Sequence, residues 1–222
     1  MAYYRAVTYA RDERLALAAL LDKVGPEAAT LCEGWRTADL AAHLVLRERR
    51  PDVSIGNIGG PLQRRTARIQ HAVAARMPFP LLVEQFRTGP PRLSFFGLPG
   101  IDARLNFAEF FVHHEDVRRA QPQWEPRALS SGLTEEIWNR LSAAGMLLRK
   151  IPVGIEFARD DQALGAGSAV RKTVRPRTPM VTVIGAPAEL MLWTFGRAGA
   201  AAVRLEGAEA DVEALARARW GA

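Results

Sequence analysis

The segment "AEFFVHHEDVRRA", residues 108 to 120, combines apolar residues at helical spacing with many titratable side chains. The titratable groups at its centre are Glu109, His113, His114, Glu115 and Asp116. Burying such groups costs free energy unless each has a hydrogen-bonding or charged partner. The segment therefore predicts a packed helix whose polar side chains either bind a ligand or form hydrogen bonds and ion pairs with one another.

The chain before this segment begins with a predicted helix. Residues 2 to 24 carry apolar residues at three- and four-residue spacing, and Gly25-Pro26 is a helix stop. The apolar residues of this stripe are Leu15, Ala18 and Leu21.

A second helix is predicted between Gly34 and Pro51. Thr37 suits the N-cap, and Asp39 falls in the first turn, where the helix dipole favours an anion. Pro51 terminates the helix, which carries His43 on its apolar side.

Two more helices complete the first part of the chain. Residues 62 to 76 and 80 to 88 predict a third helix broken by "MPFP", and residues 101 to 120 a fourth, closed by Pro122. Four helices within residues 1 to 128 favour a four-helix bundle.

The pattern changes in residues 129 to 222, which predict a small α/β domain and make the whole chain α+β. Its first helix, residues 133 to 150, belongs to this domain or packs on the bundle. Short β-branched segments predict strands at 153 to 158, 169 to 174, 180 to 185 and 201 to 207, with helices at 187 to 195 and 209 to 219.

The composition of the chain indicates where in the cell the protein is expected. The 222 residues are 48% hydrophobic and 24% charged, without a secretory leader pattern or an apolar run of the ~18 residues that span a membrane. We therefore expect a cytoplasmic protein, monomeric or homodimeric. A single cysteine, Cys32, excludes an intramolecular disulfide and is interpreted as a small packed residue and not as a nucleophile.

The net charge of +6 and the pI of about 10.2 raise the alternative of nucleic-acid binding. However, the basic residues are spread along the chain, and their densest run, residues 171 to 177, alternates as a strand edge does. The charge distribution therefore argues against a nucleic-acid-binding module, which is kept as an alternative.

A metal site is predicted from the helix spacing. Glu109 and His113 are four residues apart and share one helix face, where they form a common surface pair or hold an ion. His43 is the natural third ligand, unless it is an ordinary interior histidine, and His114 competes with His113. Two imidazoles and a carboxylate with an open position suit catalytic Zn²⁺, although other divalent metals take the same ligands.

The remaining polar residues near this site are expected at the surface. Glu115 and Asp116 would face solvent or pair with Arg118 and Arg119, and His71, in a polar context, would be exposed.

Two motifs carry a family resemblance. "LCEGWRTADLAAHLVLRE" contains, in order, Gly34, Trp35, Thr37, Asp39, Leu40, His43 and Leu44. "NFAEFFVHHEDVRRA" contains Glu109, His113, His114, Asp116 and Arg118. Together they resemble the N-terminal domain of the mycothiol-dependent maleylpyruvate isomerase family, which is similar to the DinB and YfiT-like metal-dependent thiol transferases. The resemblance implies His43, Glu109 and His113 as the metal ligands.

The resemblance extends along the chain. "GAPAELMLWTFGR", residues 185 to 197, looks like the C-terminal domain of that family, a small unit akin to sterol-carrier folds. Residues 52 to 99 look more like an uncharacterised actinobacterial metal-binding subgroup, and this segment would shape the pocket mouth. The resemblance implies mycothiol as thiol co-substrate and leaves the electrophile open.

The expected function follows from these ligands. A divalent ion held by two neutral imidazoles and one carboxylate keeps a positive charge, which lowers the pKa of a coordinated thiol or water. We expect mycothiol-dependent isomerisation or S-transfer on a small electrophile, with a non-catalytic metal sensor or store as alternative. Arg47 and Arg197 are candidates to bind a substrate carboxylate, and solvated surface is the alternative for both.

Overall fold

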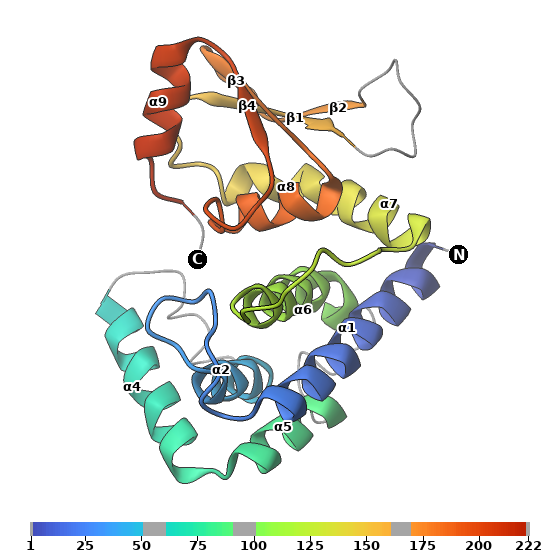
Figure 1. Cartoon of the computed structure of the whole chain (residues 1–222), viewed down its shortest axis with the longest axis vertical. Helices are drawn as coiled ribbons and strands as arrows, with labels where there is room; N and C mark the ends of the chain where they lie inside the picture. Colours follow the sequence, from blue (N-terminus) through green and yellow to red (C-terminus); the bar gives the residue numbers. More distant parts are fainter. Residues whose placement is uncertain (1, 51–60, 91–100, 161–169, 221–222) are drawn as a thin grey trace. The chain divides into compact units, whose positions relative to one another are not determined.

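The protein is described by a computed structural model that covers residues 2 to 50, 61 to 90, 101 to 160 and 170 to 220, with side chains except at residues 2 to 8, 61 to 65 and 101 to 105. The fold is mixed α+β, and the chain divides into two compact units, Met1–Pro126 and Arg127–Ala222 (Figure 1). Among the described residues, no helix combines the length and the apolarity needed to cross a bilayer.

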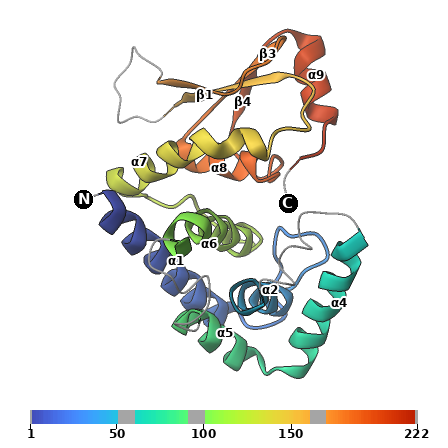
Figure 2. The same ribbon diagram turned by 180° about the vertical axis from the view of Figure 1, so that it is seen from behind.

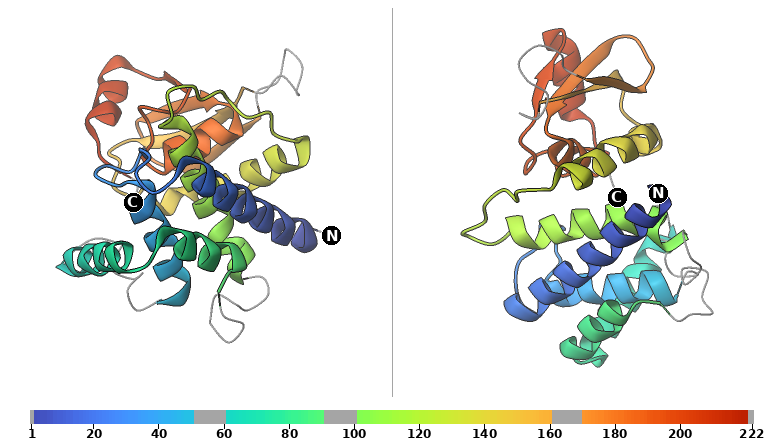
Figure 3. Two further views of the ribbon diagram at one scale, coloured as in Figure 1. Left: turned by 60° about the horizontal axis from the view of Figure 1, so that its bottom comes forward. Right: turned by 90° about the vertical axis from the view of Figure 1, so that its right-hand side faces the viewer.

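The first unit is helical. Its described helices are α1 (Ala2–Val24), α2 (Thr37–Arg49), α4 (Pro61–Arg76), α5 (Phe79–Thr88) and α6 (Ile101–Arg119). The predicted third helix thus consists of two separate helices, α4 and α5, because "MPFP" interrupts the helical conformation. Helices α1 and α6 lie side by side, α4 packs on α2, and α5 contacts both α1 and α2 (Figures 1 and 3).

Helix α1 ends where the sequence predicts, but its buried stripe differs. Gly25 has a φ of 77°, which favours glycine, and its N–H donates to the carbonyl of Leu21 at 3.0 Å. Leu17, Ala18 and Leu21 are buried, whereas Leu15 is 41% exposed. The prediction for Leu15 was wrong because its direction on the helix lies to one side of the packed stripe.

Helix α2 begins differently from the prediction. Arg36, not Thr37, is the N-cap, and its N–H donates to Oδ2 of Asp39 at 3.0 Å. Thr37 is the first helical residue, and its hydroxyl donates to the carbonyl of Gly25 instead of capping the helix. Asp39 does lie in the first turn. The predicted terminator, Pro51, lies outside the described residues.

Apolar side chains from four helices form the core of the first unit. Its largest members are Leu17, Leu21, Leu40, Leu44, Leu82, Phe86 and Phe110. The rings of Phe86 and Phe110 meet edge to face, with their centroids 5.2 Å apart. Helices α2 and α6 thus each contribute an apolar face to this core and keep a second face for polar groups.

A buried ion pair ties α1 to α2 inside this unit. Nη1 of Arg14 lies 2.8 Å from Oε2 of Glu48 and 2.8 Å from the carbonyl oxygen of Phe86. The guanidinium also lies over the ring of Phe110, 4.6 Å from its centroid. The positive charge of Arg14 is therefore compensated by Glu48, although the side chain is buried, with only 7% of its surface exposed.

The second unit combines a four-stranded sheet with helices. Its elements are α7 (Ser131–Arg140), a 3-10 helix (Leu141–Met146), β1 (Gly154–Arg159), β2 (Arg171–Arg175), β3 (Met180–Gly185), α8 (Pro187–Thr194), β4 (Arg204–Glu206) and α9 (Glu209–Arg217). The strand order is β2-β1-β3-β4; β1 and β3 are parallel, and the two outer pairs are antiparallel. Helices α7 and α8 lie side by side along the sheet (Figure 2).

The core of the second unit lies between the sheet and α8. In the parallel register Ile155 pairs with Val181 and Phe157 with Val183, and all four side chains are buried. Trp193 of α8 meets the ring of Phe157 edge to face at 6.0 Å. Alternation along the strands thus directs one apolar face toward α8.

The first helix of this unit is shorter than the predicted 133 to 150. The α-helix ends at Arg140 and continues as a 3-10 helix to Met146. Gly145 approaches β2 so closely that a Cβ atom there would lie 2.4 Å from the carbonyl oxygen of Val174. This contact with the sheet, which the helical periodicity does not show, fixes the path of the last turns.

Candidate metal centre

Polar side chains line one face of α6. Asn106, Glu109, His113 and Asp116 recur at intervals of three and four residues, so they project from the same side of the helix. Helix α2 contributes His43, which contacts Glu109, and Arg47 one turn later, which contacts Asn106. The region between α2 and α6 therefore holds polar groups that partner one another.

The structure brings the three predicted ligands together. Oε1 of Glu109 lies 3.1 Å from Nε2 of His43 and 3.2 Å from Nε2 of His113. One donor atom from each of the three residues lies within 4.8 Å of the other two. Nitrogen and oxygen ligands of a tetrahedral Zn²⁺ are separated by about 3.4 Å. The two distances that meet at Glu109 are therefore within about 0.3 Å of the separation in a zinc site, and we call these three residues the first donor set.

Charge and burial act differently on the two histidines. Burial lowers the pKa of His43, and this effect outweighs its hydrogen bond to Glu109. Burial also acts to lower the pKa of His113, but the hydrogen bonds to Asp116, Cys32 and Glu109 outweigh it and raise the pKa well above the ordinary value. His43 thus favours the neutral form that a ligand needs, while His113 must lose a proton to bind an ion.

Glu109 is held as a carboxylate. Its burial alone would raise the pKa, but the hydrogen bonds from His113 and His43, together with the charges of His113 and Arg47, lower it well below the ordinary value. The site therefore keeps an anionic oxygen ready for a cation at neutral pH.

Arg47 belongs to this network and is not solvated surface. Its Nε lies 3.4 Å from Oε1 of Glu109, its Nη1 donates to Oδ1 of Asn106, and its side chain is 17% exposed. Arg197 lies in the second unit, where its Nη1 donates to the carbonyl oxygen of Phe195 at 2.6 Å. Arg47 thus contacts the first donor set, and Arg197 contacts the backbone of its own unit.

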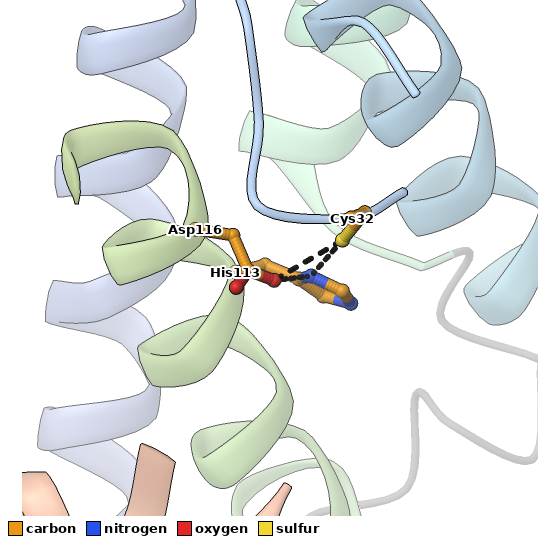
Figure 4. A group of neighbouring side chains, drawn as sticks. All are labelled: Cys32, His113 and Asp116. Atoms are coloured by element: carbon orange, nitrogen blue, oxygen red, sulfur yellow. Dashed lines mark hydrogen bonds and ion pairs between the residues drawn. The ribbon is translucent and has the colours of Figure 1, made fainter. Parts of the chain in front are cut away.

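Two functional candidates were missed from the sequence. Two alternatives were predicted for Asp116, and the one in which it faces solvent was wrong, because the residue is fully buried. Its Oδ2 accepts a hydrogen bond from Nδ1 of His113 at 2.8 Å and from the thiol of Cys32 at 3.2 Å (Figure 4). The spacing from Glu109 through His113 to Asp116 is a signal that points to Asp116.

Cys32 reaches this place from the loop between α1 and α2. The N–H of Leu31 donates to the carbonyl of Asp116 at 3.1 Å, which ties the loop to α6 beside the cysteine. Within the loop, the N–H of Cys32 donates to Oγ1 of Thr30 at 3.2 Å, and the N–H of Trp35 donates to the carbonyl of Cys32 at 3.0 Å. Cys32 is therefore positioned by the backbone and is more than a packed apolar residue.

The other histidines lie elsewhere. Nδ1 of His114 is 2.9 Å from Oε2 of buried Glu13 on α1, so this competing ligand does not belong to the first donor set. His71 is exposed, as predicted, and its Nδ1 lies 3.0 Å from Oδ1 of Asp39.

Glu115 follows its predicted pairing, although it is buried. Its oxygens accept hydrogen bonds from Arg118 at 2.9 Å and Arg119 at 2.8 Å. From Glu109 to Arg119, some titratable side chains of α6 thus face the candidate site, and others form ion pairs away from it.

Comparisons of the chain with models of protein families, with curated proteins and with solved structures found no match. The functional interpretation therefore rests on the site itself. Imidazole nitrogens with one carboxylate oxygen are a ligand set that Zn²⁺ and several other divalent ions accept.

Proposed function

We propose that this protein is a divalent-metal-dependent enzyme that uses a low-molecular-weight thiol, mycothiol, as nucleophile toward a small electrophile. In this proposal the first unit is a DinB-like bundle that holds Zn²⁺ through His43, Glu109 and His113, and the second unit is a sterol-carrier-like domain. The convergence of the three donor atoms from α2 and α6 carries the proposal.

The surroundings of the ligands support a site that holds its ligands in place. Asp116 accepts the Nδ1 proton of His113 and thereby leaves Nε2 as the nitrogen that faces Glu109. Such carboxylate–histidine pairs orient metal-binding imidazoles and increase their basicity. Trp35 packs beside the ring of His43, with centroids 5.1 Å apart. These contacts orient the imidazole rings of His43 and His113 before a metal ion binds.

The first donor set supplies three ligands, so an ion bound there would retain a coordination position for a thiol and would lower the pKa of that thiol toward neutrality. Arg47 lies beside Glu109, and we propose that it also binds a carboxylate of the substrate when one is present. Arg197 is the second candidate for this role.

Two reactions are compatible with a positioned thiolate. In isomerisation, sulfur adds to an activated double bond, the carbon–carbon bond rotates, and elimination returns the thiol. In S-transfer, sulfur displaces a leaving group or adds permanently to the electrophile. A net change of substrate geometry without consumption of thiol distinguishes the first reaction from the second.

The deciding experiment measures bound metal by mass spectrometry in the wild type, Glu109→Gln and His113→Ala, with His71→Ala as a matched control. We expect one ion per chain in the wild type and in the control, and a loss of the ion in both site variants. Calorimetric titration with mycothiol should then show binding to the metal-loaded wild type and His71→Ala, and no binding to the two site variants. Absence of metal from all four proteins would overturn the proposal.

Other outcomes identify the alternative classes. Bound metal without any engagement of thiol would point to a sensor or store. A steeply salt-dependent affinity for DNA that survives His113→Ala would point to a nucleic-acid-binding module. Basic residues of the run 171 to 177 already contact their own unit: Arg171 pairs with Glu156 at 2.7 Å, and Lys172 donates to the carbonyl of Trp138 at 2.6 Å.

A further inference from the structure

We propose that Cys32, His113 and Asp116 form a second cation position, which takes a thiophilic divalent ion of the Zn²⁺ and Cd²⁺ class. This second donor set uses the Nδ1 side of His113 (Figure 4). The first donor set uses Nε2. The proposal does not depend on thiol chemistry at the first donor set.

The three donor atoms already face one another. Sγ of Cys32 lies 3.8 Å from Nδ1 of His113 and 3.2 Å from Oδ2 of Asp116, and the nitrogen and oxygen are 2.8 Å apart. Ligands of a tetrahedral Zn²⁺ are separated by about 3.4 to 3.6 Å for these atom types. The Sγ–Oδ2 and Nδ1–Oδ2 distances therefore have to widen by roughly 0.3 and 0.6 Å to make room for an ion.

The chemistry of the donors selects the class of ion. A cysteine sulfur is a soft ligand and favours Zn²⁺ or Cd²⁺ over Mg²⁺ and Ca²⁺, which prefer oxygen. The imidazole suits the same ions, and the carboxylate of Asp116 offsets their charge. Asp116 is fully buried, and Cys32 is partly exposed, so the ion can reach the thiol from solvent.

The position of the thiol is set by the fold. The hydrogen bond from the N–H of Leu31 to the carbonyl oxygen of Asp116 holds the residue before Cys32 against α6. The sequence separation of Cys32 and Asp116 is 84 residues, and this backbone contact spans it. The loop therefore delivers the thiol to the carboxylate without requiring movement of α6.

Sharing of His113 couples the two positions. A neutral imidazole offers one lone pair, so His113 binds an ion through Nδ1 or through Nε2. An ion in the second donor set also removes the hydrogen bond to Asp116 that orients His113 toward the first donor set. A thiophilic ion at Cys32 should therefore lower the affinity of the first donor set.

The test is a titration of the metal-free full-length chain with Cd²⁺, followed through the ultraviolet thiolate-to-cadmium charge-transfer band. Because Cys32 is the only cysteine in the chain, this band reports on one position. We expect a saturable band with one Cd²⁺ per chain in the wild type, and the same band in His43→Ala, which lacks the first donor set.

Asp116→Asn in the His43→Ala background should weaken Cd²⁺ binding at least tenfold, while Asp39→Asn, a carboxylate outside the set, should leave it unchanged. Cys32→Ser should abolish the band while its circular dichroism matches the wild type. As a second readout, stoichiometric Cd²⁺ should slow alkylation of Cys32 by iodoacetamide, and Mg²⁺ should not.

Two results would overturn the proposal. The first is bound Cd²⁺ without a charge-transfer band, since the ion would then sit elsewhere. The second is a band whose affinity is the same in Asp116→Asn, since Cys32 would then act as a lone thiol. Because the second donor set can also hold Zn²⁺ in Glu109→Gln, the metal content of that variant is measured in the Cys32→Ser background, so that the two proposals fail independently.

Discussion

His113 and Asp116 lie three residues apart on α6, and their facing atoms, Nδ1 and Oδ2, are 2.8 Å apart in a buried contact. The other ring nitrogen of His113 faces Glu109 at 3.2 Å. The imidazole of His113 is thus held between two carboxylates. They fix the plane of the ring, with Nδ1 facing Asp116 and Nε2 facing Glu109.

Asp116→Asn should weaken binding of Zn²⁺ to the first donor set by about 10- to 100-fold, the usual effect of losing the carboxylate partner of a metal-binding histidine. Competition with a chelator of known affinity measures this change. Asp39→Asn is the matched control, because Asp39 contacts His71 at the surface and neither donor set. Equal affinities of wild type and Asp116→Asn would mean that Asp116 does not support His113.

The stability of the metal-free protein should decrease as pH rises above neutrality. His113 has a raised pKa, so its contribution to the free energy of unfolding is complete below its ordinary pKa of 6.5 and is lost as pH rises through the folded-state value. The lowered pKa values of His43 and Glu109 place their stability changes below pH 6.5 and 4.5, outside this window.

Urea denaturation in the presence of a chelator, from pH 6.5 upward, checks this dependence. The wild type should lose stability across the range, and His113→Gln should not show the same slope. Parallel curves for the two proteins would assign the pH dependence to another group.

Glu48→Gln should lower the free energy of unfolding by about 3 to 5 kcal/mol, because it leaves the buried guanidinium of Arg14 without its counter-charge. Glu84→Gln is the contrasting control. Glu84 is 53% exposed and pairs with Arg87 at the surface, so its loss should cost less than about 1 kcal/mol. Similar losses in both variants would show that Arg14 finds another partner.

Gly145→Ala should destabilise the second unit by about 1 to 3 kcal/mol, since the added methyl would overlap the carbonyl of Val174 in β2. Gly199→Ala, where a Cβ meets no atom within 4 Å, should change stability little. Thermal unfolding of the two variants beside the wild type provides the measurement, and an unchanged melting temperature in Gly145→Ala would contradict the close contact.

Local patterns account for much of the fold and for part of the site. Apolar spacing and the Gly25 stop predicted α1, and the four-residue step from Glu109 to His113 predicted their shared face. The errors arose where a distant segment decides the outcome. The close contact of Gly145 with β2 ends the regular α-helix earlier than the local sequence predicts. Cys32 contacts Asp116 because the loop between α1 and α2 packs on α6.

The N-cap of α2 shows the same limit at short range. Thr37 has a suitable side chain, but its hydroxyl is engaged by the carbonyl of Gly25, and the backbone of Arg36 is satisfied by Asp39. Residue type narrows the candidates for a cap, and competition among nearby acceptors decides between them.

Helices α2 and α6 each present an apolar face to the core and a polar face to one another. The groups that would choose an ion, such as His43 and Glu109, are therefore separate from the groups that hold the helices together, such as Leu44 and Phe110. Evolution can consequently exchange one ligand at a time and change the metal or the chemistry while the bundle persists. The same separation makes this unit a practical scaffold for engineering new metal preferences.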